Sequence, residues 1–340
     1  MAKKTLTVSV TLALIGILIQ LCGCESRPAS GNNLRTTLTD DALDAQADRI
    51  IRGALVNSEP QVRTSAIEVV AAIPVNEGRK FMPEVGRLLK DEFVPVRFAA
   101  AVAIGDTSYA PAKGDVIQLL RDKDENVRLA ASYALFKLGG TNASDEPVRN
   151  AINSSDQKVR ANAAFLLGKT GDKGAIKILY QAIRDEASDD RVRLNSIEAI
   201  ARLGDERIYQ KIWAMLISAY ADDRVFGIQA MGALGTVRAK EAIETMLKDD
   251  LTEVRLAAAE QLGRLGDTEG EKIVTDALEQ AASNISDKED RARIETLAAM
   301  ATGQIRTPAL KKFLPELLKN ESLFVRMAAA KSVFQCALKR

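Results

Sequence analysis

Apolar residues recur along most of the chain at a helical spacing of three and four residues, and this pattern repeats every 31 to 38 residues. The pattern is clearest over 254–267, where Val254 and Arg255 open an apolar stretch that contains Gly263 and ends beside Gly266. Aligned on the arginine, successive copies are spaced by 34, 31, 32, 33, 31, 31, 38 and 33 residues. The aligned arginines are Arg63, Arg97, Arg128, Arg160, Arg193, Arg224, Arg255, Arg293 and Arg326. The spacing predicts about nine repeated units over residues 40–340.

Each unit is expected to fold as two antiparallel helices joined by tight turns. A small or β-branched residue three positions after the arginine lets neighbouring helices approach closely. Glycine recurs eight or eleven positions after the arginine, and the later glycine is suited to ending a helix in a left-handed turn. An acidic residue often lies four positions before the arginine, where it would cap the second helix. The spacing of 38 predicts a protruding turn around Gln280–Ile285.

These repeats resemble the HEAT family, and more closely the short, Val-Arg-rich HEAT-like repeats first noted in phycobilisome-type bilin lyases. The resemblance covers residues 41–340 and implies an all-α fold. The expected architecture is an α-solenoid, a right-handed superhelix of about nine HEAT-like helix pairs that stack into a curved array with the second helices on its concave side. In such arrays the arginine lies between repeats and pairs with an acid near a helix start. The alternative is a basic ladder that binds phosphate or acidic peptides.

The first 23 residues predict a lipoprotein signal peptide. Lys3 and Lys4 precede an uncharged, mostly apolar run from Leu6 to Leu21, which is short for a spanning helix. The run ends in Leu-Cys-Gly-Cys, which resembles the cleavage site of bacterial lipoproteins, with Cys24 as the lipidated first residue. Two or three acyl chains such as palmitate would hold the protein stably to a bilayer. An uncleaved anchor and an ordinary signal peptide are the alternatives.

Residues 24–39 are polar and without apolar periodicity, which predicts a flexible tether before the solenoid of residues 40–340. The predicted location is the bacterial cell envelope. Family knowledge of such signals associates Asp at the second mature position with the inner membrane of enteric bacteria. Glu25 stands at that position and therefore favours the outer membrane, facing the periplasm, in a Gram-negative cell.

Composition disfavours most catalytic chemistry. The chain has no histidine, which removes the commonest general base and metal ligand. Its formal charge of +1 disfavours a dedicated nucleic-acid binder. Aromatic residues make up only 4%, so the core must be built from small aliphatic side chains. We therefore expect a non-enzymatic protein with no cofactor, no metal and no nucleic-acid partner.

Positions two, five and nine after each arginine point away from the core arc and should form the concave face. In the third to sixth units these positions combine aromatic, amide and cationic side chains, which are typical of a groove for an extended peptide. Glu198–Arg202 and Glu260–Arg264 are expected to form ion pairs along their helices and to need no ligand. The candidate partner-binding residues are Tyr133, Lys137, Asn162, Phe165, Lys169, Asn195, Arg202 and Phe226.

The predicted function is a non-catalytic, membrane-tethered scaffold or assembly factor that binds a protein or peptide on its concave face. A bilin-lyase-like or other enzyme-associated subunit is one alternative, and export to the envelope argues against it. A purely structural spacer is the other. Whether the last unit is capped is left open, because Phe334 and Cys336 would make an uncapped end a second docking surface.

Overall fold

The computed structural model describes residues 40–139 and 145–337, and every regular element in these ranges is helical. The helices follow one another as antiparallel pairs, which confirms the all-α solenoid of about nine units. Residues 1–39, with the predicted signal, Cys24 and the tether, lie outside the described residues. Among the described residues, no helix is long and apolar enough to cross a membrane.

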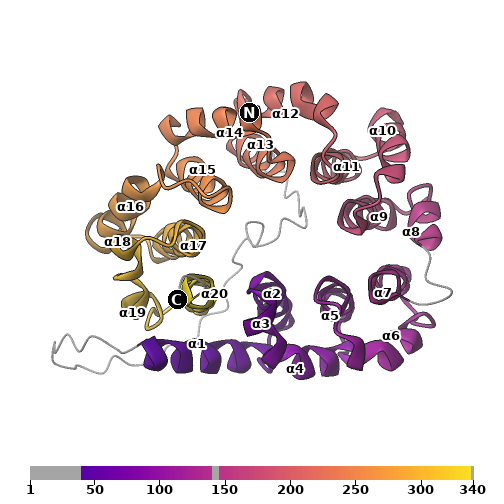
Figure 1. Cartoon of the computed structure of the whole chain (residues 1–340), viewed down its shortest axis with the longest axis horizontal. Helices are drawn as coiled ribbons and strands as arrows, with labels where there is room; N and C mark the ends of the chain where they lie inside the picture. Colours follow the sequence, from indigo (N-terminus) through magenta and orange to yellow (C-terminus); the bar gives the residue numbers. More distant parts are fainter. Residues whose placement is uncertain (1–39, 140–144, 338–340) are drawn as a thin grey trace, which may run out of the picture.

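The second helix of each pair lies on the inside of the array, as the repeat pattern predicts (Figure 1). Because each inner helix packs mainly against its two inner neighbours, the inner helices form a continuous layer. They are α2 (Pro60–Ala72), α5 (Val94–Asp106), α7 (Glu125–Leu138), α9 (Gln157–Thr170), α11 (Asp190–Arg202), α13 (Ala221–Leu234), α15 (Thr252–Arg264), α17 (Lys288–Ile305) and α20 (Leu323–Ala337).

The outer helices are shorter and often begin or end in a 3₁₀ turn (Figure 1). They are α1 (Asp40–Leu55), α3 (Val75–Gly78), η1 (Arg79–Phe81), α4 (Met82–Arg87), η2 (Leu88–Lys90), η3 (Ala110–Ala112), α6 (Lys113–Leu119), α8 (Glu146–Ala151), η4 (Lys173–Ala175), α10 (Ile176–Arg184), η5 (Glu206–Ile208), α12 (Tyr209–Leu216), α14 (Val237–Thr245), η6 (Met246–Lys248), α16 (Glu271–Asn284), α18 (Pro308–Lys311) and α19 (Leu314–Leu317).

Local sequence sets where the inner helices begin and end. The Asp124 carboxylate accepts hydrogen bonds from the backbone N–H groups of Asn126 and Val127, so it caps α7 as predicted. At the other end of α9, Gly171 adopts φ of 82°, a left-handed conformation that glycine adopts without steric cost. Glycine and aspartate therefore mark the unit boundaries that the repeat pattern indicates.

Small residues allow the inner helices to pack almost backbone to backbone. A Cβ atom added at Gly168 of α9 would lie 2.6 Å from the Cα atom of Ala199 on α11. At Gly263 of α15 an added Cβ would lie 2.8 Å from the backbone nitrogen of Ile305. Such distances leave no room for a side chain, which explains the glycine eight positions after the arginine.

The repeated arginine links consecutive units, so its predicted structural role is confirmed. Arg97 is 6% exposed, and its Nε and Nη2 atoms donate to the Asp122 carboxylate of the next unit at 2.8 and 2.9 Å. Its Nη1 atom also donates to the carbonyl of Asp91 at 2.8 Å. Arg63 makes the same paired contact with the Asp91 carboxylate. A bidentate pair that also satisfies turn carbonyls ties each inner helix to the following turn.

The eighth unit departs from the sequence alignment. Arg293 is exposed and pairs with Glu253 and Asp290 instead of linking to the next unit. Arg291 donates to the carbonyl of Ile285, six residues earlier, and Glu295 accepts a hydrogen bond from the Asn320 side chain, 25 residues later. The added residues extend helices α16 and α17, so the protruding turn predicted at 280–285 is not formed.

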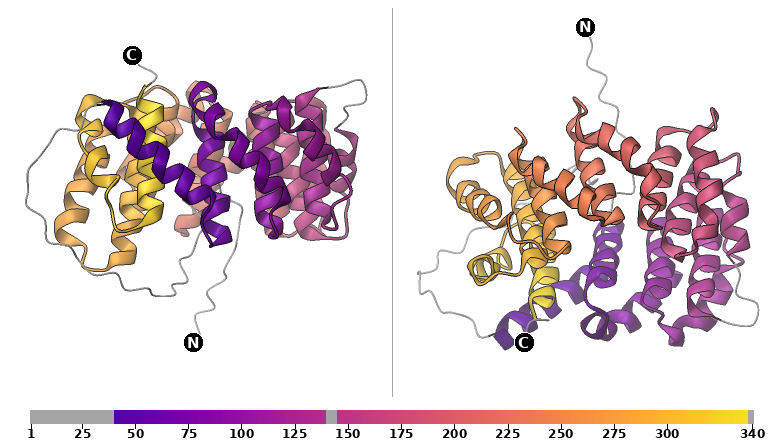
Figure 2. Two further views of the ribbon diagram at one scale, coloured as in Figure 1. Left: turned by 90° about the horizontal axis from the view of Figure 1, so that it is seen from below. Right: turned by 45° about the horizontal axis from the view of Figure 1, so that its top comes forward.

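The array closes on itself, whereas the sequence predicted an open, curved stack. Helices α1 and α2 pack against α20, which makes a ring with a central opening (Figure 1). Seen from below in Figure 2, α1 crosses obliquely beside α20. At this seam the rings of Phe81 and Phe334 meet edge to face at 5.9 Å, and the Gln46 amide donates to the carbonyl of Leu318 at 3.2 Å.

Closure also settles the state of the last unit. Phe334 is 1% exposed and Cys336 is 4% exposed, so neither forms part of a docking surface. The Lys80 ammonium lies 4.3 Å from the Phe334 ring centre, which places a cation over the face of that aromatic ring. The first unit therefore covers the apolar end of the last one.

Candidate functional site

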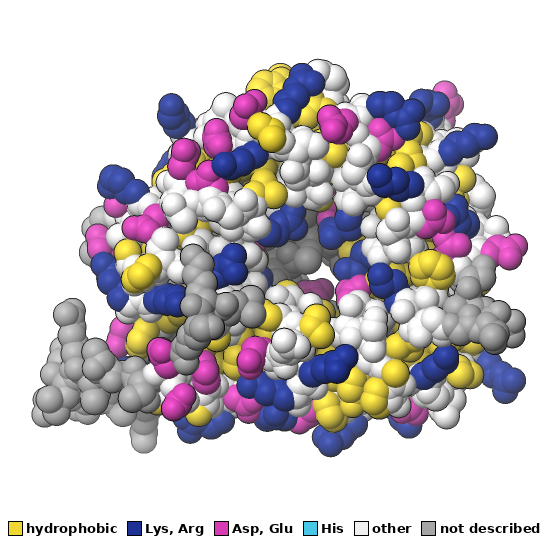
Figure 3. Space-filling model, viewed as in Figure 1, with side chains coloured by type: hydrophobic (Ala, Val, Ile, Leu, Met, Phe, Trp, Pro, Cys, Tyr) yellow, Lys and Arg dark blue, Asp and Glu magenta, His cyan; other side chains and the backbone are white. Residues whose placement is uncertain are grey.

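The inner helices surround a central opening, and Figure 3 shows this hollow with Lys and Arg side chains around it. We call the side chains that face it the channel wall. Their positions five and nine residues after the repeated arginine, and the electrostatic coupling between members on different helices, place them together. The channel wall comprises Glu68, Asp106, Tyr133, Lys137, Phe165, Lys169, Glu198, Arg202, Glu260, Arg264 and Lys331.

Three of the predicted residues meet in one cluster. The Tyr133 hydroxyl donates to the Asp106 Oδ1 atom at 2.5 Å, and the Lys169 ammonium lies 2.9 Å from Asp106 Oδ2. The same ammonium lies 5.3 Å from the ring centre of Phe165. Burial and the Asp106 carboxylate raise the pKa of Tyr133, so the phenol stays protonated and donates. Asp106 thus joins α5, α7 and α9.

Glu68 of α2 lies near the same cluster. Burial raises its pKa to about 7, and the positive charge of Lys169 opposes that shift. Its carboxyl group makes no ion pair in the described part of the chain, because Lys169 is engaged by Asp106. Glu68 is therefore a carboxyl group that titrates near neutral pH in the channel wall.

Three other predicted residues are not free concave side chains. Tyr133 has no exposed surface, Asn195 is 3% exposed and Phe226 is 3% exposed. The Asn195 amide donates to the carbonyl of Ala161 at 2.9 Å, and the half-buried Asn162 amide donates to Asn126 at 2.8 Å. The inner helices pack so closely that these side chains lean on the neighbouring helix, which corrects the expectation that they line an open groove.

The two remaining candidates differ in their pairing. Arg202 is exposed and donates to Glu198 at 2.5 Å, so the predicted ion pair along α11 is confirmed. Lys137 is half-buried and forms no hydrogen bond or ion pair with the residues that the structure describes. It lies four residues after Tyr133 and therefore shares its side of α7.

The other ion pair expected from spacing is absent from the described residues. Glu260 and Arg264 are four residues apart on α15, yet they form no contact within salt-bridge distance, which corrects that prediction. Lys331 of α20 lies close enough to influence the pKa of Glu260. Sequence reasoning did not select Glu260, Arg264 or Lys331, although all three stand in the columns that define the concave face.

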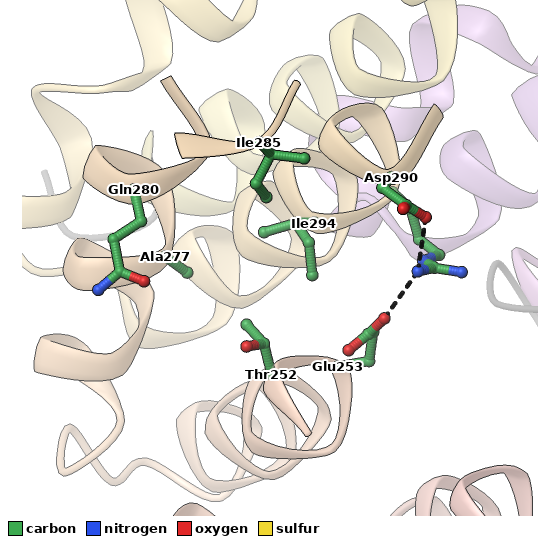
Figure 4. Close-up of a pocket in the computed structure, with 8 residues that line it drawn as sticks. Thr252, Glu253, Ala277, Gln280, Ile285, Asp290 and Ile294 are labelled. Atoms are coloured by element: carbon green, nitrogen blue, oxygen red, sulfur yellow. Dashed lines mark hydrogen bonds and ion pairs between the residues drawn. The ribbon is translucent and has the colours of Figure 1, made fainter. Parts of the chain in front are cut away.

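A second hollow lies away from the channel, between α15, α16 and α17. It has a volume of about 330 Å³, and Figure 4 shows Ile285 and Ile294 beside Thr252 and Glu253 at its rim. Arg293 closes one side of it by bridging Glu253 and Asp290, each at 2.9 Å. This pocket arises where the eighth unit departs from the regular repeat.

Family models match two parts of the chain. Residues 145–225 match the model of HEAT repeats, and residues 254–284 match that of the PBS lyase HEAT-like repeat. The chain contains HEAT repeats. Both matched stretches lie in the solenoid, and together they cover helices from α8 to α16. No curated protein matches the chain.

Several solved structures are similar to the chain at low identity. The complex of CpcE and CpcF of phycocyanin lyase from Nostoc sp. PCC7120 is 19% identical, with 82% of this chain and 98% of that chain covered and a TM-score of 0.42. Human deoxyhypusine hydroxylase is 17% identical, with 87% and 97% covered and a TM-score of 0.33. Kap121p is 14% identical, with 86% and 37% covered and a TM-score of 0.35. At these values we take no functional argument from them.

Proposed function

We propose that this protein is a non-catalytic, lipid-anchored ring of the bacterial envelope that binds an extended protein segment along its channel wall. The observation that supports this proposal most directly is Lys137, a cation on the Tyr133 side of α7 that has no partner in the described residues. Solenoids present extended concave surfaces to their partners, and here closure encloses that surface.

The candidate residues then have two roles. Lys137 and the half-buried ring of Phe165 are available for contact with a partner. Tyr133 and Asn195 are buried and bonded, so they shape the wall and hold neighbouring helices in place. Lys169 serves both roles, because its ammonium is tied to Asp106 while it lies over Phe165.

Site-specific crosslinking in intact cells tests the binding proposal. A photo-reactive amino acid at position 137 should capture one protein, which mass spectrometry of the product identifies. The matched control is position 211, because Lys211 is exposed on the outer helix α12. Equal capture at both positions, or none at 137, would overturn binding in the channel and favour a structural spacer.

Charge reversal separates the same alternatives in another way. Lys137→Glu should abolish capture by a reporter placed elsewhere on the channel wall, whereas Lys211→Glu should leave it unchanged. A spacer would tolerate both changes. The match to a PBS lyase HEAT-like repeat keeps an enzyme-associated subunit as the second candidate. That candidate requires the captured protein to be an enzyme whose activity depends on this chain.

The anchor is tested separately. Cells grown with radiolabelled palmitate should label the wild-type protein, and Cys24→Ser should lose both the label and the membrane association. Cys336→Ser is the matched control, because Cys336 lies in the folded ring. Label that persists in Cys24→Ser would overturn the predicted lipidation site.

A further inference from the structure

The channel wall holds a second group of charges on α15 and α20 that the structure does not pair. Glu260 is 7% exposed and Lys331 is 4% exposed, yet neither makes an ion pair or hydrogen bond with the residues described. Arg264 is exposed to the channel and is likewise without a hydrogen bond or ion pair there. Buried charges are normally paired, so this unbonded group is unusual.

The balance of charge in this group is positive. Arg202, Arg264 and Lys331 are three cations, and Glu198 and Glu260 are two anions, which leaves one positive charge. Glu198 is already engaged by Arg202. Crowding by protein and the charge of Arg202 lower the pKa of Arg264, and burial lowers the pKa of Lys331. An anion placed here would relieve that mutual repulsion.

The position of Arg264 suits a bound group. One Nη atom of Arg264 lies 3.1 Å from where a Cβ atom of Gly232 would be, so the guanidinium lies across the inner side of α13. The absence of a side chain at Gly232 leaves that space to Arg264 and Gln261. The planar guanidinium presents several N–H donors in a geometry that matches a carboxylate.

We infer that Arg264, supported by Arg202 and Lys331, binds a carboxylate carried by an acidic segment of the partner polypeptide. This inference rests on the proposed function, because it assumes that a polypeptide enters the channel. It assigns the chemistry of that segment, which the candidate residues of the opposite wall do not. The Arg264 guanidinium would donate to the carboxylate, while Glu260 holds the Lys331 ammonium near the site.

The test is a titration of the full chain, purified in detergent, with a fluorescein-labelled hexaglutamate peptide. Fluorescence anisotropy should show binding that weakens as salt is added. Arg264→Gln should weaken it by roughly 10- to 100-fold, the loss expected for hydrogen bonds to a charged group. Arg264→Lys should fall between the two, since it keeps the charge and loses the fork.

The matched control is Arg87→Gln, because Arg87 is exposed on the outer helix α4 and also has no partner among the described residues. Its affinity for hexaglutamate should equal that of the wild type. Thermal melting of each variant checks that the ring is intact, so a loss of binding with unchanged melting is specific to the site. Arg264→Lys keeps the test open if the glutamine variant does not fold.

A second arm distinguishes a polypeptide from a small free acid. Glutarate should compete with hexaglutamate only weakly if the site is built for a chain segment. Glutarate that competes as well as unlabelled hexaglutamate would overturn the polypeptide assignment. No binding of hexaglutamate to the wild type, or equal binding to Arg264→Gln, would overturn the inference while leaving the crosslinking result at position 137 unaffected.

Discussion

Two stretches of the channel wall use the same repeat positions in opposite ways. On α5, α7 and α9, Asp106 bonds both Tyr133 and Lys169, so the charges of three helices form one network. On α15 and α20, Glu260 and Lys331 occupy equivalent positions five residues after their arginines and are not bonded to each other. We call these the paired stretch and the unpaired stretch.

The difference teaches that repeat position alone does not determine the role of a side chain. In the paired stretch the charges link helices and contribute to stability. In the unpaired stretch the same positions carry a desolvation cost without a compensating bond, and such a cost is typical of sites that serve a ligand. The following predictions test that division, from the largest expected effect to the smallest.

The helix contacts behind both stretches should be equally tight. Gly168→Ala and Gly263→Ala should each cost about 3 kcal/mol of stability, because the added Cβ atom would lie 2.6 to 2.8 Å from the next helix. Urea unfolding measures both variants. Gly114→Ala is the control, because nothing lies within 4 Å of a Cβ atom there. A large cost at only one of the two positions would show that the stretches differ in packing as well as in pairing.

Removing one acid should separate the stretches directly. Asp106→Asn should cost about 2 kcal/mol, because it removes the charge that holds the Lys169 ammonium and accepts from Tyr133. Glu260→Gln should change stability by less than about 0.5 kcal/mol, because no bond is lost. Both values come from urea unfolding. Equal losses would mean that Glu260 is held by interactions comparable to those of Asp106.

Glu68 should make stability depend on pH at the edge of the paired stretch. Its pKa is raised to about 7 from 4.5, so the native state retains its proton where the unfolded state releases it. Stability should therefore fall as pH rises between these values, by at most about 2 kcal/mol for a partly exposed side chain. Glu68→Gln should lack this fall when unfolding is compared at about pH 4.5 and about pH 8.

An exposed ion pair gives the baseline for all of these changes. Lys288 and Glu321 lie 3.2 Å apart, with exposed side-chain fractions of 83% and 87%. Glu321→Gln should change stability by less than about 0.5 kcal/mol, because water and salt screen such pairs. A greater loss in thermal melting would show that charge changes anywhere in the ring are costly, and the contrast between Asp106 and Glu260 would lose its meaning.

The sequence predicts the parts of this fold that depend on local chemistry. Asp124 caps a helix and Gly171 ends one in the conformation that their positions indicate. The repeated arginine makes its structural bonds, as Arg97 does with Asp122. These features follow from spacing because each depends on neighbours within one or two units.

Closure of the ring could not be predicted in this way. It depends on the sum of small rotations between units, and no single residue encodes that sum. The seam contact of Phe81 with Phe334 therefore appears only in the structure, as does the meeting of Arg264 with Arg202. The misplacement of Arg293 has a different cause, because α17 is longer than its counterparts and shifts the alignment.

The seam also determines how the ring responds to mechanical load. Helix α1 begins at Asp40, so a pull on the chain before that residue acts first on α1 and its contacts with α20. Those contacts include the stacked Phe81 and Phe334 rings and the hydrogen bond from Gln46 to Leu318. Tension along the N-terminal segment would thus open the ring at its seam, while the glycine-packed helices of the other units keep their shape.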